Sequence, residues 1–247
     1  MATPLNGVPM SARRRLTLAT LGLLCLAVLA ARPVYASESS PAAGSPPPAT
    51  RLADFLGESV SDDARETANW VIRSGDNRGR PFIIVDKKST KVFVFDRRAN
   101  LKGATIALLG LAVGDESAPG VGDRPLSQIP PEERTTPAGR FVASFGLNLL
   151  GQDILWVDYD AALALHRVLD AGSSQYRLER LAPRSGLSRR VTFGCINVPV
   201  KFYEEVVQSE FQGTVGVVYI LPETKPVHEV FPGQRAGGPG GAAASAT

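Results

Sequence analysis

The sequence predicts a mainly β domain, built as a β-sandwich or closed sheet with a few short helices. Short runs of β-branched and aromatic residues recur along the chain, and segments rich in glycine and proline separate them. Helical features are confined to a few short stretches. No repeat with a period of 20–50 residues is present, so a solenoid is excluded.

The strand-like runs begin at residues 82–85 and 91–95, which residues 86–90 join as a hairpin. We expect five further strands along the chain. They are residues 104–113, 140–145, 154–159, 163–168 and 215–221.

Two helices are expected between and around these strands. Ser61 is placed to cap a helix that continues to about residue 73, because the two aspartates that follow it suit the positive end of a helix. A second, short helix is expected at about residues 200–208. Residues 114–134 form a long segment rich in proline and glycine, without periodicity, and we interpret it as a candidate lid over a site.

Residues 1–36 have the pattern of a secretory signal peptide. Arginines at positions 13–15 precede an uncharged apolar stretch, residues 16–31, and a small-x-small cleavage motif ends at Ala36. The apolar stretch is shorter than the roughly 20 residues of a membrane span. An uncleaved anchor helix is the alternative. We expect cleavage after Ala36, a location in the periplasm or cell envelope, and membrane contact only through the transient signal peptide.

Composition divides the remainder of the chain into further segments. Residues 37–50 are rich in proline, serine and alanine and are expected to be a linker. Residues 51–80 are an N-terminal helical segment, and residues 81–222 form the main domain. Residues 232–247 are a tail rich in glycine and alanine that we expect to be disordered.

The charge balance argues against a nucleic-acid partner. The chain has a formal net charge of +3 and a pI near 9.0. Four of its 27 basic residues lie within residues 1–36, and without them 23 basic residues face 24 acidic residues. The basic character therefore belongs to the N-terminus, and a polyanion has no electrostatic support elsewhere.

Cleavage of the signal peptide would remove Cys25 and leave Cys195 as the only cysteine, which excludes a disulfide within the mature chain. In an oxidising compartment a lone thiol is either buried and inert or kept for its chemistry. The sequence has no CxxC or HxxxH pattern, so we expect no metal. It also lacks a phosphate loop of Walker or Rossmann type, and we expect no cofactor.

Cys195 follows a strand-like run and Gly194, and it precedes the second expected helix, which places the thiol on a tight turn. Glycine allows backbone torsions there that other residues resist. Exposed N–H groups at such a turn stabilise both a thiolate and a developing oxyanion. His166 is the only histidine in the strand-rich region, whereas His228 is expected at the surface. The alternative is that Cys195 is a small buried hydrophobe and His166 a satisfied core residue.

Three elements of the sequence together resemble the L,D-transpeptidase catalytic domain of the YkuD type. They are Thr-Thr-Pro-Ala-Gly-Arg-Phe at residues 135–141, His166, and Thr-Phe-Gly-Cys-Ile-Asn-Val at residues 192–198. The resemblance covers about residues 80–221 and implies an L,D-transpeptidase-like β-sandwich whose catalytic domain is residues 81–222.

The resemblance also implies the chemistry. Cys195 would attack the carbonyl that joins a diamino acid to a terminal D-alanine in a peptidoglycan stem tetrapeptide, with His166 as the base. The N–H groups of Gly194 and Cys195 would be oxyanion donors, and Thr192 and Asn197 would position the turn or the substrate. The expected function is an exported cysteine acyltransferase that forms 3–3 cross-links between stem peptides.

Three features depart from the family pattern. Phe193, which we group with the substrate-positioning residues, stands where many members have histidine. Arg167 stands where glycine is frequent, and the 28 residues between His166 and Cys195 exceed the common spacing. A catalytically silent peptidoglycan-binding module of the same fold is therefore one alternative. An L,D-carboxypeptidase and a protein-to-peptidoglycan transferase are the others.

Residues 156–160 allow two further interpretations. Asp158 and Asp160 are a spaced carboxylate pair of the kind that acid–base chemistry uses, although turn aspartates are commoner. Trp156 and Tyr159 either border a substrate cleft or pack in the core.

Residues 171–190 are polar and basic, and they are either a solvated loop or a contact to an anionic glycan–peptide.

Overall fold

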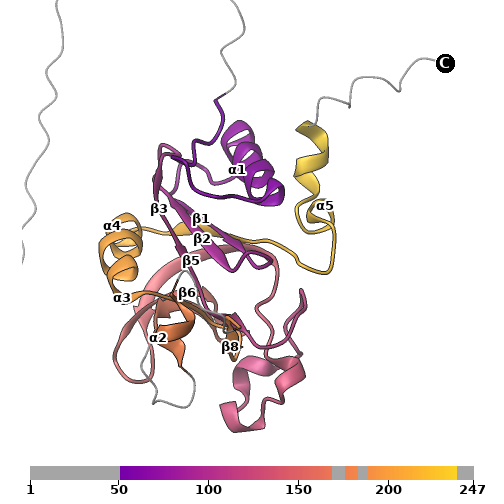
Figure 1. Ribbon diagram of the computed structural model, residues 1–247, viewed down its shortest axis with the longest axis vertical. Coiled ribbons are helices and arrows are strands. Elements are labelled where there is room, and N and C mark those ends of the chain that lie inside the picture. Colours follow the sequence, from indigo (N-terminus) through magenta and orange to yellow (C-terminus); the bar gives the residue numbers. More distant parts are fainter. Residues whose placement is uncertain (1–50, 169–175, 183–187, 238–247) are drawn as a thin grey trace, which may run out of the picture. The chain divides into compact units, whose positions relative to one another are not determined.

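A mixed β-sheet organises the computed structural model, which describes residues 51–168, 176–182 and 188–237 (Figure 1). The predicted signal peptide and linker lie outside the described residues. Eight strands follow the order β3-β2-β1-β10-β5-β6-β7-β9, and β4 pairs with β8 separately. The strands are β1 Phe82–Asp86, β2 Lys91–Phe95, β3 Leu101–Ile106, β4 Leu109–Gly110, β5 Gly139–Leu147, β6 Asp153–Asp158, β7 Leu163–Arg167, β8 Arg190–Thr192, β9 Ile196–Val198 and β10 Gly216–Ile220.

The sheet bends along β5 and nearly closes on itself. Residues 139–143 of β5 pair with β10, and residues 144–147 pair with β6, so this strand belongs to both halves. At the far edge, Leu108 exchanges two backbone hydrogen bonds with Asn197 of β9, at 2.8 and 2.9 Å. The prediction of a mainly β fold is confirmed.

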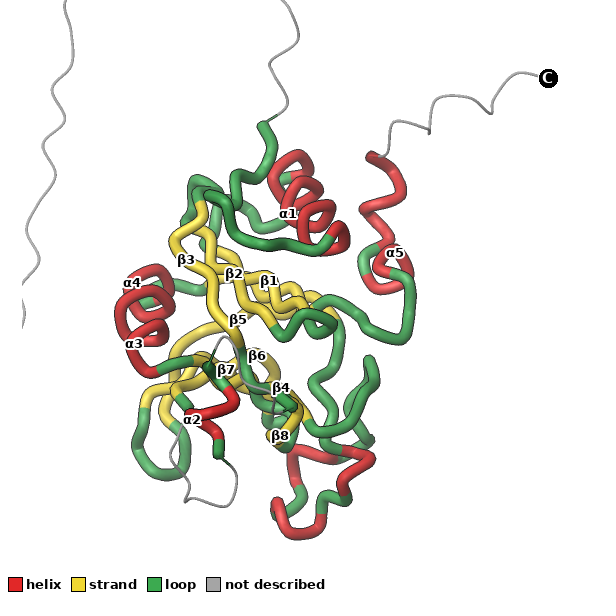
Figure 2. The backbone as a smooth tube through the Cα atoms, viewed as in Figure 1, coloured by secondary structure: helices red, strands yellow, loops and turns green. Residues whose placement is uncertain are grey.

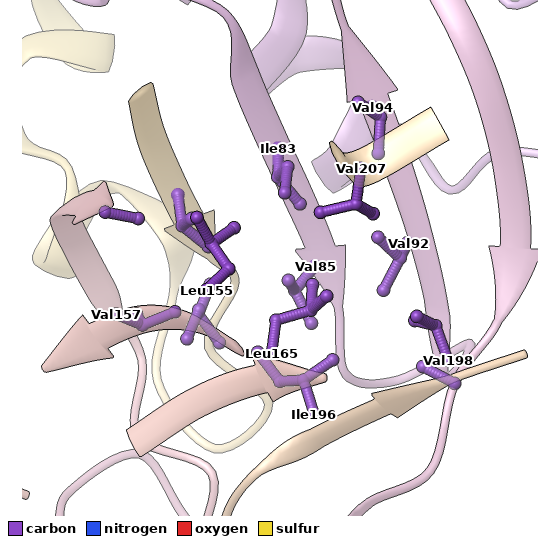
Figure 3. Close-up of a cluster of buried hydrophobic side chains, with 14 of the residues drawn as sticks. Ile83, Val85, Val92, Val94, Leu155, Val157, Leu165, Ile196, Val198 and Val207 are labelled. Carbon is purple, nitrogen blue, oxygen red and sulfur yellow. The ribbon is translucent and has the colours of Figure 1, made fainter. Parts of the chain in front are cut away.

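The two halves of the sheet enclose one hydrophobic core. Figure 3 shows side chains from the hairpin of β1 and β2 facing those from β6, β7 and β9. The labelled members of this core are Ile83, Val85, Val92, Val94, Leu155, Val157, Leu165, Ile196, Val198 and Val207. Because the alternate residues of β1 and β2 are buried on the opposite face, these strands are continuous apolar runs.

A helix, α1 at Asp62–Ser74, contributes to the core on that opposite face. The Ser61 hydroxyl accepts a hydrogen bond from the Ala64 N–H at 3.2 Å, as predicted for the cap. Gly75 ends the helix in the left-handed conformation, with φ of 66°. The N-terminal segment therefore packs on the main sheet.

The second predicted helix is longer than expected and irregular. It comprises α3 Val200–Phe202, a π-helical turn at Tyr203–Val207 and α4 Gln208–Phe211. Tyr203, Val207 and Phe211 are fully buried in the core between the two halves of the sheet, which explains why the helix continues past residue 208.

Two predictions of the fold are wrong in part. The single strand expected at residues 104–113 is divided into β3 and β4, because Leu108 leaves the β2 ladder to pair with β9. The tail expected from residue 232 begins with a 3₁₀ helix, Pro232–Gly237, whose Gln234 donates to the Thr67 hydroxyl at 3.0 Å. This helix follows α5, Val227–Val230, which the sequence analysis missed. Residues 238–247 lie outside the described part.

None of the helices within the described ranges is long and apolar enough to cross a membrane.

Candidate active site

Cys195 lies on the turn that joins β8 to β9. The Thr192 hydroxyl accepts a hydrogen bond from the Gly194 N–H at 3.2 Å and donates one to the Cys195 carbonyl at 2.7 Å. Gly194 has φ of 135°, and a Cβ at this position would lie 2.8 Å from the Thr135 carbonyl oxygen. The turn therefore requires glycine immediately before the cysteine.

The Thr-Thr-Pro segment, residues 135–137, packs against this turn and stabilises it by hydrogen bonds. The Thr136 hydroxyl donates to the Gly194 carbonyl at 2.7 Å and accepts from the Gly110 N–H at 2.8 Å. Thr136 is fully buried. Two segments of the sequence that carried the resemblance are thus in direct contact.

The turn forms part of a pocket of about 340 Å³ that includes Cys195. The wall facing it comes from residues 114–134, the predicted lid, which contain the 3₁₀ turns Val121–Asp123, Leu126–Gln128 and Pro131–Glu133 (Figure 2). Much of the lining is apolar, and it includes Val121, Leu126, Ile129, Leu149, Ala162, Leu163 and Phe193. The Arg134 guanidinium lies 4.1 Å from the centre of the Phe193 ring, which fastens this wall to the turn.

The surroundings of Cys195 favour a protonated thiol. Its Sγ donates to the Ala162 carbonyl at 3.6 Å. Burial raises the pKa of Cys195, and the backbone N–H groups of Ala164 and Cys195, with the charge of Arg177, oppose that rise without cancelling it. A base is therefore needed to produce the thiolate at neutral pH.

His166 lies on β7, opposite Asn197 of β9. Arg177, on the short helix α2 at Arg177–Arg180, donates to the Asn197 Oδ1 at 3.3 Å, so the Nδ2 end of that amide faces the His166 Nε2, at 2.9 Å. The His166 Nδ1 lies 2.8 Å from the Arg167 carbonyl oxygen. This pattern assigns the proton to Nδ1, and burial lowers the pKa of His166, so the ring is neutral.

The cysteine and the histidine are neighbours on one face of the sheet, but they are not bonded. Cys195 is two residues before Asn197, a rise of about 7 Å along the strand. His166 lines a separate, small pocket with Ile154. Cys195 and His166 are both described in the structure, and no hydrogen bond joins the Cys195 Sγ to the His166 ring. The role of His166 as the base therefore stays a prediction.

The predicted oxyanion donors need one correction. The Gly194 N–H already donates a hydrogen bond to the Thr192 hydroxyl, so in this conformation it is not available to an oxyanion. The Cys195 N–H is the remaining donor of the predicted pair. The predicted role of Thr192 in ordering the turn agrees with its two hydrogen bonds, and it is 3% exposed.

A buried charge cluster beneath the site was missed from the sequence. The Lys87 ammonium is fully buried and donates to the Gly114 carbonyl, the Asp115 carboxylate at 2.7 Å and the Thr136 carbonyl at 2.9 Å. These acceptors come from both ends of the predicted lid. No local signal distinguishes Lys87 from Lys88, which is exposed and pairs with Asp63.

Asp115 extends this cluster to the segment after β10. Its carboxylate accepts hydrogen bonds from the backbone of Glu223, Thr224 and Lys225 and from the Thr224 hydroxyl. Burial alone would raise the pKa of Asp115, but the hydrogen bonds from Lys87 and Thr224 outweigh it and hold that pKa well below its usual range. Glu223 in turn pairs with Arg190 of β8, which leads into the cysteine turn.

Arg167, one of the departures from the family pattern, has a structural role. It pairs with Asp153 at 2.9 Å and with Glu204 at 3.0 Å, and it lies over the Tyr203 ring. It therefore ties β7 to β6 and to the π-helical turn.

Asp158 has a structural role as well. Its carboxylate accepts from the Asp160 and Ala161 N–H groups at 3.0 and 3.3 Å, which is a turn rather than an acid–base pair. Across residues 51–168, 176–182 and 188–237, no group of three or more His, Cys, Asp or Glu side chains is placed to hold a metal ion.

The fold and the site together define a mainly β protein in which Cys195 opens to a pocket. Among solved structures, the chain is similar to the helical cell shape determining protein Pgp2 from Campylobacter jejuni, with 14% identity over 66% of this chain and a TM-score of 0.37. The chain spans 57% of that protein. An L,D-transpeptidase from Stackebrandtia nassauensis is 10% identical, with 66% of this chain and 68% of that chain covered and a TM-score of 0.36.

The catalytic domain of an E. faecium L,D-transpeptidase is 18% identical, with 58% of this chain and 98% of that domain covered and a TM-score of 0.32. No family model matches the sequence, and no curated protein matches it. The chemistry of the site is therefore inferred from the residues of this chain.

Proposed function

We propose that the protein is an exported cysteine acyltransferase of the L,D-transpeptidase type that acts on peptidoglycan stem peptides. One observation carries this proposal. Thr136 and Gly194, which belong to two separate parts of the family-like sequence, are hydrogen bonded at 2.7 Å beside the cysteine. A chance likeness in two distant segments gives no reason for them to meet at one turn.

In the proposed reaction the Cys195 sulfur attacks the carbonyl carbon next to the terminal D-alanine. The thiol proton passes to the His166 ring, which first exchanges its hydrogen bond to Asn197 for one to the thiol. The carbon–nitrogen bond then breaks, D-alanine leaves with the proton from the ring, and a thioester remains on Cys195. The Cys195 N–H lies at the turn where the oxyanion would develop.

The second half of the proposed reaction restores the thiol. An amine of a second stem attacks the thioester, loses a proton to His166 and forms the 3–3 cross-link. Water in place of the amine would make the protein an L,D-carboxypeptidase, and a protein amine would make it a protein-to-peptidoglycan transferase. The product identifies the acceptor.

A catalytically silent binding module is the second candidate. The hydrogen bond between Asn197 and the His166 Nε2, together with the raised pKa of the thiol, favours it. Both candidates share the pocket and the brace of the turn. They differ in whether a thioester forms.

Turnover of a purified disaccharide-tetrapeptide separates the candidates. We expect the mature protein to release D-alanine and to form a cross-linked dimer, both detected by liquid chromatography with mass spectrometry. Cys195→Ser should form neither product while its circular dichroism spectrum stays unchanged. Release of D-alanine by Cys195→Ser, or no release by the unmodified protein, would contradict the proposal.

Export is proposed on the pattern of residues 1–36. The N-terminal sequence of protein recovered from the cell envelope should begin at Ser37. A chain that begins at Met1 or Ala2 would contradict cleavage.

A further inference from the structure

Trp156 and Tyr159 form a stacked pair of aromatic rings on the outer side of the sheet. Their ring centres lie 4.6 Å apart at an angle of 22°. The pair lies against Gly146 of β5, where a Cβ would be 2.8 Å from the indole of Trp156 and 3.1 Å from the hydroxyl of Tyr159. Tyr159 nevertheless stays 65% exposed. A large aromatic surface is thus held in place while remaining open to solvent.

The register of the strands relates this pair to the cysteine. Leu155, Leu165 and Ile196 occupy one cross-strand row that faces the core. The next row, on the opposite face, contains Trp156 and Ala164, and Cys195 continues it immediately before β9. Two strand spacings, about 10 Å, therefore separate Trp156 from Cys195.

The same stretch of chain connects the aromatic pair to the pocket. Ala161 and Ala162, which follow Tyr159 in the turn between β6 and β7, line the pocket that contains Cys195. Asp160 is exposed beside them and can accept hydrogen bonds from hydroxyl groups. The surface next to the pocket thus combines an aromatic face with a polar rim.

We propose that Trp156 and Tyr159 are a binding platform for a pyranose ring of the peptidoglycan glycan strand, next to the stem peptide that Cys195 would cleave. This inference rests on the proposed function. The face of an aromatic ring is electron-rich, and it attracts the slightly positive C–H groups on one side of a sugar ring. The Tyr159 hydroxyl and the Asp160 carboxylate would take the sugar hydroxyls at the rim.

The length of the stem peptide matches the distance of about 10 Å between Trp156 and Cys195. In a stem tetrapeptide that is cleaved before its last residue, three residues separate the reacting carbonyl from the sugar. Three extended residues reach about 10 Å. A donor whose carbonyl lies at Cys195 would therefore place its sugar near the aromatic pair.

The experiment compares two donors, a disaccharide-tetrapeptide and the free tetrapeptide, by their KM values. Tyr159→Ala should raise the KM for the disaccharide form about tenfold and leave the KM for the free peptide within about twofold. Tyr159→Phe keeps the ring and loses only the rim hydroxyl, so its KM for the disaccharide form should lie between those of the unmodified protein and of Tyr159→Ala. Tyr176→Ala, at another exposed tyrosine, is the matched control for a surface truncation.

An equal change in KM for both donors, or no change for either, would overturn the platform and leave the pair as a cover for Gly146. Turnover of neither donor by the unmodified protein would instead contradict the proposed function. The platform is then tested by binding to Cys195→Ser in a Trp70→Phe background, where Trp156 is the only tryptophan. The disaccharide-tetrapeptide should quench its fluorescence and the free peptide should not; equal quenching by both would overturn the platform.

Discussion

The Cys195 thiol and the His166 ring lie in surroundings that keep both groups neutral. Burial raises the pKa of the thiol and lowers the pKa of the imidazole. This differs from a thiolate–imidazolium pair, in which each charge stabilises the other. Proton transfer would then accompany attack on a substrate rather than precede it.

The pH dependence of alkylation tests this protonation state. Because the folded pKa of Cys195 lies above its usual value, the thiolate fraction should be small at pH 7 and should increase about tenfold per pH unit toward alkaline pH. The rate of alkylation by iodoacetamide, followed by intact mass between pH 6 and 10, measures it. A rate that is already constant below pH 7 would indicate an ion pair instead.

Gly194 should not tolerate a side chain. In Gly194→Ala the new Cβ meets the Thr135 carbonyl oxygen, and φ of 135° strains an L-residue. We expect a loss of about 1–3 kcal/mol in the free energy of unfolding and a strong loss of acylation at Cys195. Gly213→Ala is the control, since φ is 70° there but nothing lies within 4 Å. Denaturant unfolding should give the control the smaller loss; an equal loss would contradict the close approach.

At the level of elements, residues 114–134 are held at both ends by a single buried ammonium group. Lys87 bonds to Gly114 and Asp115 at the start of the segment and to Thr136 just after it. The segment then meets the cysteine turn through Thr136. The pocket wall and the turn are thus fixed by one cluster.

Removal of the Lys87 charge should be costly. In Lys87→Met the Asp115 carboxylate would stay buried without its cation, which typically costs about 3–5 kcal/mol, whereas Glu223 would keep its ion pair with Arg190. Lys88→Met is the matched control, because its ion pair with Asp63 is exposed and is worth about 1 kcal/mol or less. The free energies of unfolding in urea measure both. Similar values for the two variants would contradict the role of Lys87.

The same cluster predicts an acid-sensitive stability. The pKa of Asp115 is lowered in the folded state, so the unfolded chain binds more protons as the pH falls. The stabilisation is therefore complete above the unfolded pKa of about 4 and is lost progressively below it. The melting temperature should fall more steeply between pH 5 and 2 in the unmodified protein than in Asp115→Asn. Parallel curves would contradict this.

Sequence reasoning succeeded for elements whose signals are local. The hairpin of β1 and β2 follows from two apolar runs around a polar loop, and the start of α1 follows from the Ser61 cap. It failed where a distant partner decides the outcome. Leu108 leaves its strand because Asn197 pairs with it, and Lys87 is buried because Asp115 and Thr136 enclose it.

The candidate site divides in the same way. The turn around Cys195 was predictable because Gly194 and Thr192 are its neighbours in the sequence. Its relation to His166 was not, because it depends on the parallel register that places Asn197 opposite the ring. Phe193 was predicted to be a substrate-positioning residue where many family members have histidine, and its contact with Arg134 became visible only with the fold.

For the molecule as a whole, near closure of the sheet unites the parts of the proposed site. β5 begins directly after the Thr-Thr-Pro segment and passes through both halves, while Leu108 joins the opposite edge to β9. Residues from the middle and the C-terminal third of the chain therefore meet around one cysteine. Acyl transfer by Cys195 is the claim that this arrangement supports.

Intact-mass spectrometry after incubation with a carbapenem tests that claim most directly, because such drugs acylate the cysteine of the L,D-transpeptidase family. We expect one adduct for each chain of the unmodified protein, located at Cys195 by peptide mapping, and none on Cys195→Ala. A folded, unmodified protein that stays free of adduct, or an adduct that persists in Cys195→Ala, would contradict the assignment of Cys195 as the nucleophile.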